Sequence, residues 1–285
     1  MSEGGCKMSD NVLKQFNLTD EEYLKLDEVE FRARFRERVH HTLEIQTYAA
    51  ANGDEVLKEN QSATAKKFIR LWEERNLPKD LPEYVYAKKL IEFSETLLRG
   101  EKLDLSEYEP YKLSDEEKDA FFKVIKERRS VRHFTDERVP DELIDKILES
   151  GLWAAHSCNL QSIKYLVVME ETTPGLFKGS DVPGGPVHLV VLQDERVYRA
   201  NPLNPVRNRL IDAGAAAQNM VLAAHALGLG SVWLTFNDAM IERISKYFNL
   251  PEYLKLVTYV DVGYPNQTPY APQRKTLKEA IEARV

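Results

Sequence analysis

Residues 163–169 have the sequence IKYLVVM and residues 187–192 have the sequence VHLVVL, two short apolar runs that are typical of buried β-strands. Two further strands are expected over residues 231–235 and 256–262. Because helical segments separate these strands, the pattern predicts a layered α-β-α arrangement. The order of the elements does not determine which strands run parallel.

Capping residues indicate where the flanking helices begin and end. Ser114 and Glu117 form a capping box at the start of a helix that ends near Arg128. Pro140 begins a second helix, with acidic residues in its first turn. An alanine-rich helix is expected over about residues 208–227, where small side chains allow another helix to approach closely.

The first part of the chain has a different, charge-rich helical pattern. A capping box at Thr19 opens a long helical segment that reaches Gly53. Two more helices are expected over about residues 54–75 and 82–98, the second ending at Gly100.

Charge divides the chain at the same point. Residues 1–115 hold 18 Lys and Arg against 24 Asp and Glu, whereas residues 116–285 hold 21 against 22. We therefore expect a helical N-terminal extension over residues 1–115 and a separate domain over residues 116–285. Neither part has the basic excess of a nucleic-acid-binding surface, so no nucleic-acid partner is expected.

Composition excludes several other classes. A chain of 285 residues can bury a core without cross-links, and its two cysteines, Cys6 and Cys158, form no disulfide framework. His40 and His41 are adjacent and point to different sides of a helix, so no metal site is expected. No apolar run is long enough for a membrane span or a signal peptide, which predicts a cytoplasmic protein without a membrane partner.

Residues 128–134, RRSVRHF, place three arginines and a serine within five positions at the end of a helix. Guanidinium groups suit phosphate because they bind it bidentately and keep their charge. The alternative is a basic helix end that complements the helix dipole.

Two further segments are rich in polar groups. Residues 154–161, AAHSCNLQ, offer the mixed donor and acceptor groups of Asn159 and Gln161, which would suit the edge of a heterocycle. A loop that satisfies only its own backbone is the alternative. A Gly-Tyr-Pro turn at residues 263–265 is followed by Arg274 and Lys275, which add further positive charge. The alternative for these two residues is an ordinary charged surface.

Taken together, RRSVRHF, AAHSCNLQ, GLGSVWL at residues 228–234, the Gly-Tyr-Pro turn and the Arg274-Lys275 pair resemble the signatures of the FMN-dependent nitroreductase superfamily in order and spacing. The resemblance covers about residues 118–285. It implies an α+β fold, a three-layer sandwich around a mixed, mainly antiparallel sheet. It also implies a homodimer with two FMN sites at the subunit interface, each built from both chains.

The resemblance implies roles for individual residues. Arg128, Arg129 and Ser130 correspond to phosphate and ribityl contacts, joined by Arg274 and Lys275 from the C-terminal arm. Arg132 has the place of the cation at the pyrimidine edge, where it would stabilise the negative charge of the reduced flavin. The other implied cofactor contacts are Ser157, Asn159, Gln161, Gly230, Ser231, Trp233 and Leu234.

The chain departs from the family pattern in the loop around His156. Two prolines usual in the family are absent, and His156 and Ser162 stand in their places. His156 is a candidate proton donor to a reduced substrate, or a histidine that only hydrogen-bonds backbone. Cys158 is a candidate redox thiol or simply a small buried residue.

The function implied by the resemblance is an FMN-dependent oxidoreductase. It would take a hydride from NADH or NADPH and pass electrons to a small, flat acceptor, such as a nitroaromatic or a quinone, in a ping-pong cycle. Alternatives are reductive dehalogenation, dehydrogenation or oxygen-dependent flavin cleavage, or a non-catalytic FMN-binding sensor or storage protein. Because the segment that covers the substrate in related enzymes is short here, we expect residues 1–115 to help form the substrate pocket.

Overall fold

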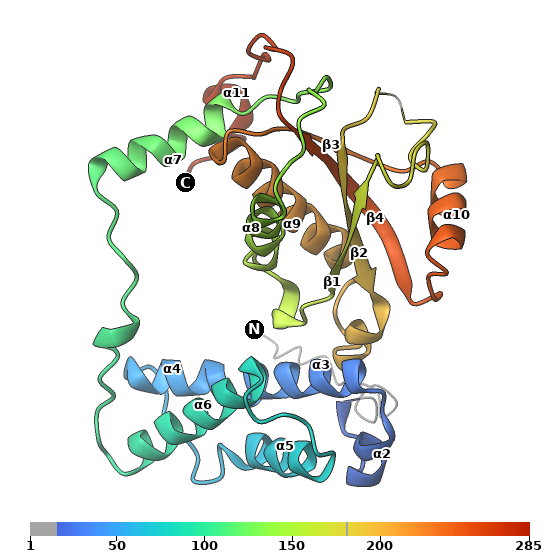
Figure 1. Ribbon diagram of the computed structural model, residues 1–285. Helices are drawn as coiled ribbons and strands as arrows, with labels where there is room; N and C mark the ends of the chain where they lie inside the picture. The colour runs from blue at the N-terminus through green and yellow to red at the C-terminus, as the bar shows by residue number, and fades with distance from the viewer. Residues whose placement is uncertain (1–15, 181) are drawn as a thin grey trace.

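A four-stranded sheet forms the centre of the C-terminal part of the molecule (Figure 1). Its strands are β1 Ile163–Met169, β2 Val187–Asp194, β3 Gly230–Leu234 and β4 Leu254–Gly263. They lie in the order β1–β2–β4–β3, and each neighbouring pair is antiparallel. Ser130 and Ser231 add a parallel bridge beside β3, so the prediction of a mixed, mainly antiparallel sheet is confirmed. The computed structural model describes residues 16–180 and 182–285, and Cys6 lies outside them.

The central strand β2 shows that both faces of the sheet are covered, because every residue from Val187 to Asp194 is buried. Successive side chains of a strand point to opposite faces. Leu189 and Val191 accordingly pack into one hydrophobic cluster, and Val190 and Leu192 pack into another. An apolar run without alternation therefore marks a strand that is covered on both sides.

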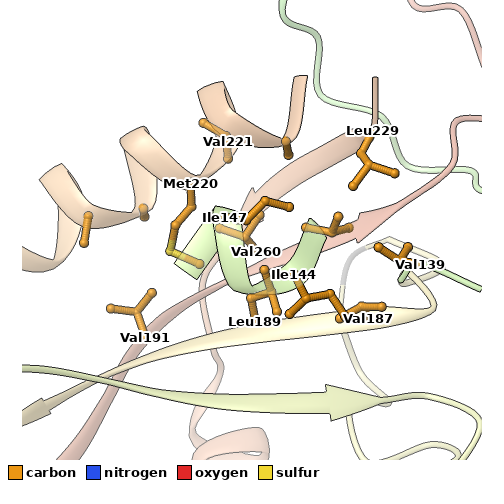
Figure 2. Close-up of a cluster of buried hydrophobic side chains, with 14 of the residues drawn as sticks. Val139, Ile144, Ile147, Val187, Leu189, Val191, Met220, Val221, Leu229 and Val260 are labelled. Carbon is orange, nitrogen blue, oxygen red and sulfur yellow. The ribbon is translucent and has the colours of Figure 1, made fainter. Parts of the chain in front are cut away.

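Helices cover the two faces of the sheet. α8 (Asp141–Leu152) and α9 (Val206–Ala226) lie on one face, where Met220 packs into the larger cluster (Figure 2). α10 (Asp238–Tyr247) covers the other face and buries Ile244 there. The three-layer α-β-α prediction is confirmed. Within the described residues, no helix combines the length and the apolar character needed to cross a membrane.

The N-terminal helices build a hydrophobic cluster of their own. They are α2 Asp20–Lys25, α3 Glu28–Val39, the π-helical turn η1 His40–Glu44, α4 Ile45–Ala51, α5 Ala63–Glu74 and α6 Pro82–Leu98. Phe35, Phe68, Trp72 and Leu90 are almost fully buried among them. Apolar side chains supplied by α3, α5 and α6, most of them aromatic, thus hold this part together.

Two of the helix predictions in this region are wrong in their bounds. The long segment breaks at Leu26, because the Asp27 side chain accepts a backbone N–H at 3.1 Å and caps a new helix. The helix expected from Asp54 begins only at Ala63. The residues before it form turns, and Val56, 89% exposed, contributes nothing to the core.

α7 (Asp115–Glu127) projects away from the sheet and from the N-terminal helices (Figure 1). It begins at the predicted capping box, yet none of its residues is buried. Phe121, Phe122 and Ile125 are all exposed on it. The segment before α7 contains only the short 3-10 helix η2 (Ser106–Tyr108). The domain boundary near residue 115 lies in this region and stays a prediction.

The extension contacts the sheet domain chiefly through α3, which packs against the 3-10 helix η4 (Glu195–Ala200). Ala33 of α3 and Leu160 belong to one buried cluster. Glu30 of α3 pairs with Arg199 of η4 at 3.1 Å. The extension is therefore joined to the sheet domain by apolar packing and by charge pairs.

Candidate active site

Cationic side chains gather where α7 ends, and within residues 16–180 and 182–285 none of Arg128, Arg129 and Arg274 forms an ion pair. Arg128 is the C-cap of α7, and its Nη1 atom is buried without a hydrogen-bond partner in the described residues. Burial, followed by the charges of Arg274 and Arg129, lowers the pKa of Arg128. A buried guanidinium nitrogen beside other cations is costly unless an anion joins them. The geometry is that of an anion-binding site.

A second unpaired group lies on the neighbouring strand. Ser231 is buried, and its hydroxyl has no partner in the described part of the chain. The bridge to Ser130 and the bond from Val131 N to Ser231 O (3.0 Å) hold the segment after α7 along β3. At Gly230 a Cβ would lie 2.9 Å from Val131 Cγ1, so glycine permits this approach.

The rest of the RRSVRHF segment is fastened to the chain after β4. Arg132 N donates to Gln267 Oε1 at 2.7 Å, and Phe134 forms a bridge with Pro265. The guanidinium of Arg132 is exposed and bonds the Ser130 carbonyl at 3.3 Å. Three of the motifs recognised in the sequence, residues 128–134, residues 228–234 and the Gly-Tyr-Pro turn, are thus brought together.

Arg274 and Lys275 follow this turn on the C-terminal arm, before α11 (Leu277–Ala280). Both side chains are exposed. The positive charge of Arg274 helps to lower the pKa of Arg128. Arg129 donates to the Lys126 carbonyl at 2.8 Å. The structure therefore brings Arg274 to the cationic cluster.

Trp233 and Leu234 lie at the far end of β3 from Gly230. The Trp233 indole donates to Thr258 Oγ1 at 2.5 Å and is 41% exposed. Its ring approaches Gly214 of α9, where a Cβ would lie 3.6 Å away. An aromatic face thus stays accessible beside α9.

The loop that carries Asn159 and Gln161 includes the 3-10 turn η3 (Ser157–Asn159). Cys158, Asn159 and Gln161 have φ values of 50°, 48° and 57°, a region that costs non-glycine residues energy. The side chains of Asn159 and Gln161 are exposed, and Gln161 donates to Asn159 at 3.2 Å. This loop lies beside α3, far from the end of α7 (Figure 1). One chain alone does not bring it to the arginines.

His156 is turned inward rather than toward this exposed surface. Its Nε2 accepts from Ser162 N at 3.1 Å, and its Nδ1 lies 3.3 Å from Asp212 Oδ2. Burial lowers the pKa of His156, although the charge of Asp212 opposes that shift. The geometry therefore favours a structural role for His156, as a neutral ring that holds the loop. It does not favour the role of proton donor to a substrate.

Asp212, which sequence reasoning missed, is the centre of this buried network. It accepts from Ser157 and from the Tyr198 hydroxyl, the latter at 3.0 Å. Tyr198 also bonds Ser162 at 2.8 Å. The sequence signal that could have indicated this role is a single acidic residue within the otherwise alanine-rich α9.

Cys158 faces a small pocket between the extension and residues 201–208. The pocket has a volume of about 300 Å³, and Glu37, His41 and Asn201 also line it. Burial raises the pKa of the Cys158 thiol, and Asn201 bonds its sulfur at 3.5 Å. A raised pKa disfavours the reactive thiolate.

The chain is similar to proteins of one family over most of the sheet domain. The model of the Nitroreductase family matches residues 125–178 and 174–264. A protein of Methanothermobacter thermautotrophicus, described as an NADH dehydrogenase/NAD(P)H nitroreductase, is 33% identical over 152 residues, which are 51% of this chain and 77% of that protein. The FMN reductase [NAD(P)H] of Bacillus subtilis is 28% identical over 50% of this chain and 65% of its own length.

Solved structures agree with this similarity. A nitroreductase-like protein of Desulfovibrio desulfuricans, crystallised in complex with FMN, matches with a TM-score of 0.50 and 31% identity. The match covers 58% of this chain and 96% of that one. A nitroreductase family protein of Clostridium difficile matches with a TM-score of 0.51 and 25% identity over 57% of this chain and 97% of its own.

Proposed function

Since this chain belongs to the nitroreductase family, we propose that it is an NAD(P)H-dependent oxidoreductase that uses FMN. When bound, FMN supplies hydride and electron transfer. The chain itself would supply the anion site and the contacts to the edge of the flavin ring. Relatives described as FMN reductases and NAD(P)H nitroreductases support this proposal.

The observation that carries the proposal is the unpaired, buried Nη1 of Arg128. A phosphate group would satisfy it bidentately and would offset the repulsion from Arg129 and Arg274. The unpaired hydroxyl of Ser231 fits the same interpretation, because a phosphate or ribityl oxygen would give it a partner. Ser130, held against Ser231 by the bridge, and Lys275 are the further proposed contacts.

The flavin ring would then be met by side chains from two chains. Asn159 and Gln161 are exposed, and the loop that carries them lies far from the end of α7 within one chain (Figure 1). A second copy that presents this loop to the arginine cluster would complete the site, so we propose a homodimer with an FMN site at each side of its interface. The exposed apolar residues of two neighbouring helices would be covered by it: Phe121, Phe122, Ile125, Leu210 and Ile211.

The acceptor is proposed to be a small, flat organic molecule. Trp233 offers a half-exposed aromatic face on the strand whose other end carries Ser231. Hydride transfer needs orientation of the reacting molecules rather than an acid or a base. The nicotinamide donor and the electron acceptor would therefore occupy the same position beside the flavin ring, one after the other. His156 is not required for that step, since its ring nitrogens face Ser162 and Asp212.

The test is a spectrum of the purified full-length protein before and after NADH or NADPH, without air. We expect a yellow protein with one FMN per chain that is bleached by the nucleotide and regains its colour with a nitroaromatic or a quinone. A colourless protein that takes up no FMN overturns the proposal. A yellow protein that neither nucleotide bleaches would indicate the non-catalytic sensor, and rapid recovery with oxygen alone would indicate an oxygen-using relative.

A further inference from the structure

The exposed loop proposed to meet the flavin is held in a conformation that its own sequence does not favour. Cys158, Asn159 and Gln161 all have positive φ, and none of them is glycine. The loop also contains no proline, a residue that would preset φ. A strained loop of this kind persists only where its surroundings over-determine it. The contacts on its two sides therefore matter for its shape.

On the side of the sheet domain, Asp212 holds the beginning of the loop. Ser157 donates its backbone N–H and its hydroxyl to Asp212 Oδ1, at 3.0 and 2.9 Å. His156 ties the end of the loop by accepting from Ser162 N. These bonds fix the two ends and leave the peptide units between them to other partners.

On the side of the extension, Arg36 of α3 reaches the middle of the loop. Arg36 Nη2 donates to the Leu160 carbonyl at 2.9 Å, across 124 positions of sequence. Its Nη1 is held by Glu83 at 3.1 Å, and Glu83 in turn accepts from Arg32 at 2.6 Å. The side chain of Arg36 is only 10% exposed. The guanidinium is thus clamped between α6 and the loop.

The Leu160 carbonyl and the N–H of Gln161 belong to the same peptide unit. A bond that fixes this carbonyl therefore also fixes the plane from which Gln161 enters its positive φ of 57°. Leu160 itself is fully buried against Ala33 of α3, so the same helix holds the residue by packing. Together these contacts make the backbone of the loop depend on the extension.

We propose that Arg36 is a positioning residue, by which the N-terminal extension fixes the loop of Asn159 and Gln161 in the shape that meets the flavin ring. This inference rests on the proposed function. It gives the extension a role in cofactor binding although none of its residues need touch the cofactor.

The experiment compares Arg36→Ala with Arg32→Ala in the full-length protein. Both changes remove a charged partner of Glu83, but only Arg36 bonds the loop. For Arg36→Ala we expect a rise of up to roughly tenfold in the FMN dissociation constant, because the loop loses one charge-assisted bond and FMN must then order it on binding. Amide hydrogen exchange of the peptide over residues 157–162 should be faster as well. Arg32→Ala should change neither quantity more than about twofold.

Arg36→Lys keeps the charge but lacks the fork that reaches two partners at once. We expect it to fold and to give intermediate values of FMN affinity and exchange, which also serves if Arg36→Ala fails to fold. Equal behaviour of the Arg36 and Arg32 variants, or an unchanged loop in Arg36→Ala, overturns the inference. A wild-type protein that binds no FMN would instead reject the proposed function, while the exchange data would still decide whether Arg36 holds the loop.

Discussion

Ser157 gives both its backbone N–H and its hydroxyl to one oxygen of Asp212, at 3.0 and 2.9 Å. The two residues are 55 positions apart, and the acid stands in the otherwise alanine-rich α9. Asp212 is almost fully buried, so these bonds are shielded from water. The start of the proposed flavin loop is thereby attached to the central helix of the domain.

Replacing Asp212 with Ala should destabilise the protein by about 2–4 kcal/mol, because it removes the buried acceptor of the Ser157 and Tyr198 donors. Urea unfolding measures this loss. Asp145→Ala, an exposed acid on α8, is the matched control and should cost less than about 0.5 kcal/mol. Equal losses in the two variants would contradict the role given to Asp212.

Arg128→Ala should raise the FMN dissociation constant about tenfold to a hundredfold, since it removes a charge-assisted bond to the phosphate. The same change should leave the melting temperature of the FMN-free protein unchanged or higher, because the unpaired Nη1 and the repulsion from Arg274 are removed. Fluorescence titration and thermal unfolding give the two numbers. Arg99→Ala, a surface arginine paired with Glu101, is the control for a general loss of positive charge. A clear loss of apo stability in Arg128→Ala would show that this arginine has a partner within the fold.

The imidazole of His188 lies between two carboxylates, Asp261 at 2.5 Å and Glu170 at 3.1 Å. Burial opposes its charge, but these partners outweigh burial and raise the pKa of His188. The charged ring therefore stabilises the fold below the unfolded-state pKa of about 6.5, and this contribution is lost as the pH rises through the raised value. In His188→Gln the alkaline decline in urea midpoint should be flatter than in wild type. Parallel profiles for the two proteins would disprove this assignment.

His156 should give a pH dependence of the opposite sign. Burial lowers the pKa of His156, and its Nε2 accepts a backbone N–H, so protonation would break that bond. The neutral ring contributes fully above about pH 6.5, and stability falls as acid protonates the ring. His156→Gln should flatten the acid side of the urea profile and leave the alkaline side as it is. If the variant steepens the acid side, the ring is charged in the folded protein.

The sequence predicted those elements whose ends carry a local signal. β1 and α6 have the predicted bounds, because an apolar run defines the first, and Pro82 and Gly100 delimit the second. The break at Asp27 was missed, since helical spacing of apolar residues continues on both sides of it. A capping aspartate inside such a pattern resembles a surface residue of one continuous helix.

The candidate site was predictable only where its residues lie in recognisable motifs. The meeting of residues 128–134 with residues 228–234 agrees with the resemblance. Asp212 and Arg36 were not foreseen, because their bonds to the loop join residues 55 and 124 positions apart. Such contacts depend on the packing of α9 and α3 and leave no local pattern.

Two glycines of the site region should respond to alanine in opposite ways. At Gly230 a Cβ would lie 2.9 Å from Val131 Cγ1 and 3.2 Å from Pro265 Cβ, so a methyl group would push apart the segments that hold Ser130 against β3. At Gly214, in the middle of α9, the nearest atom would be Trp233 Cη2 at 3.6 Å, an ordinary contact. Alanine also favours a helix by up to about 1 kcal/mol over glycine.

We therefore expect Gly230→Ala to lower the free energy of unfolding by about 1–3 kcal/mol, as overpacking does. It should also weaken FMN binding, because the serine and arginine contacts move with the displaced segment. Gly214→Ala should be neutral or stabilising by up to about 1 kcal/mol, with unchanged FMN affinity. Urea unfolding and FMN titration of the two variants measure both effects. Normal stability and FMN affinity in Gly230→Ala would mean that the segment after α7 can leave β3 without harm, and that the anion site does not depend on their contact.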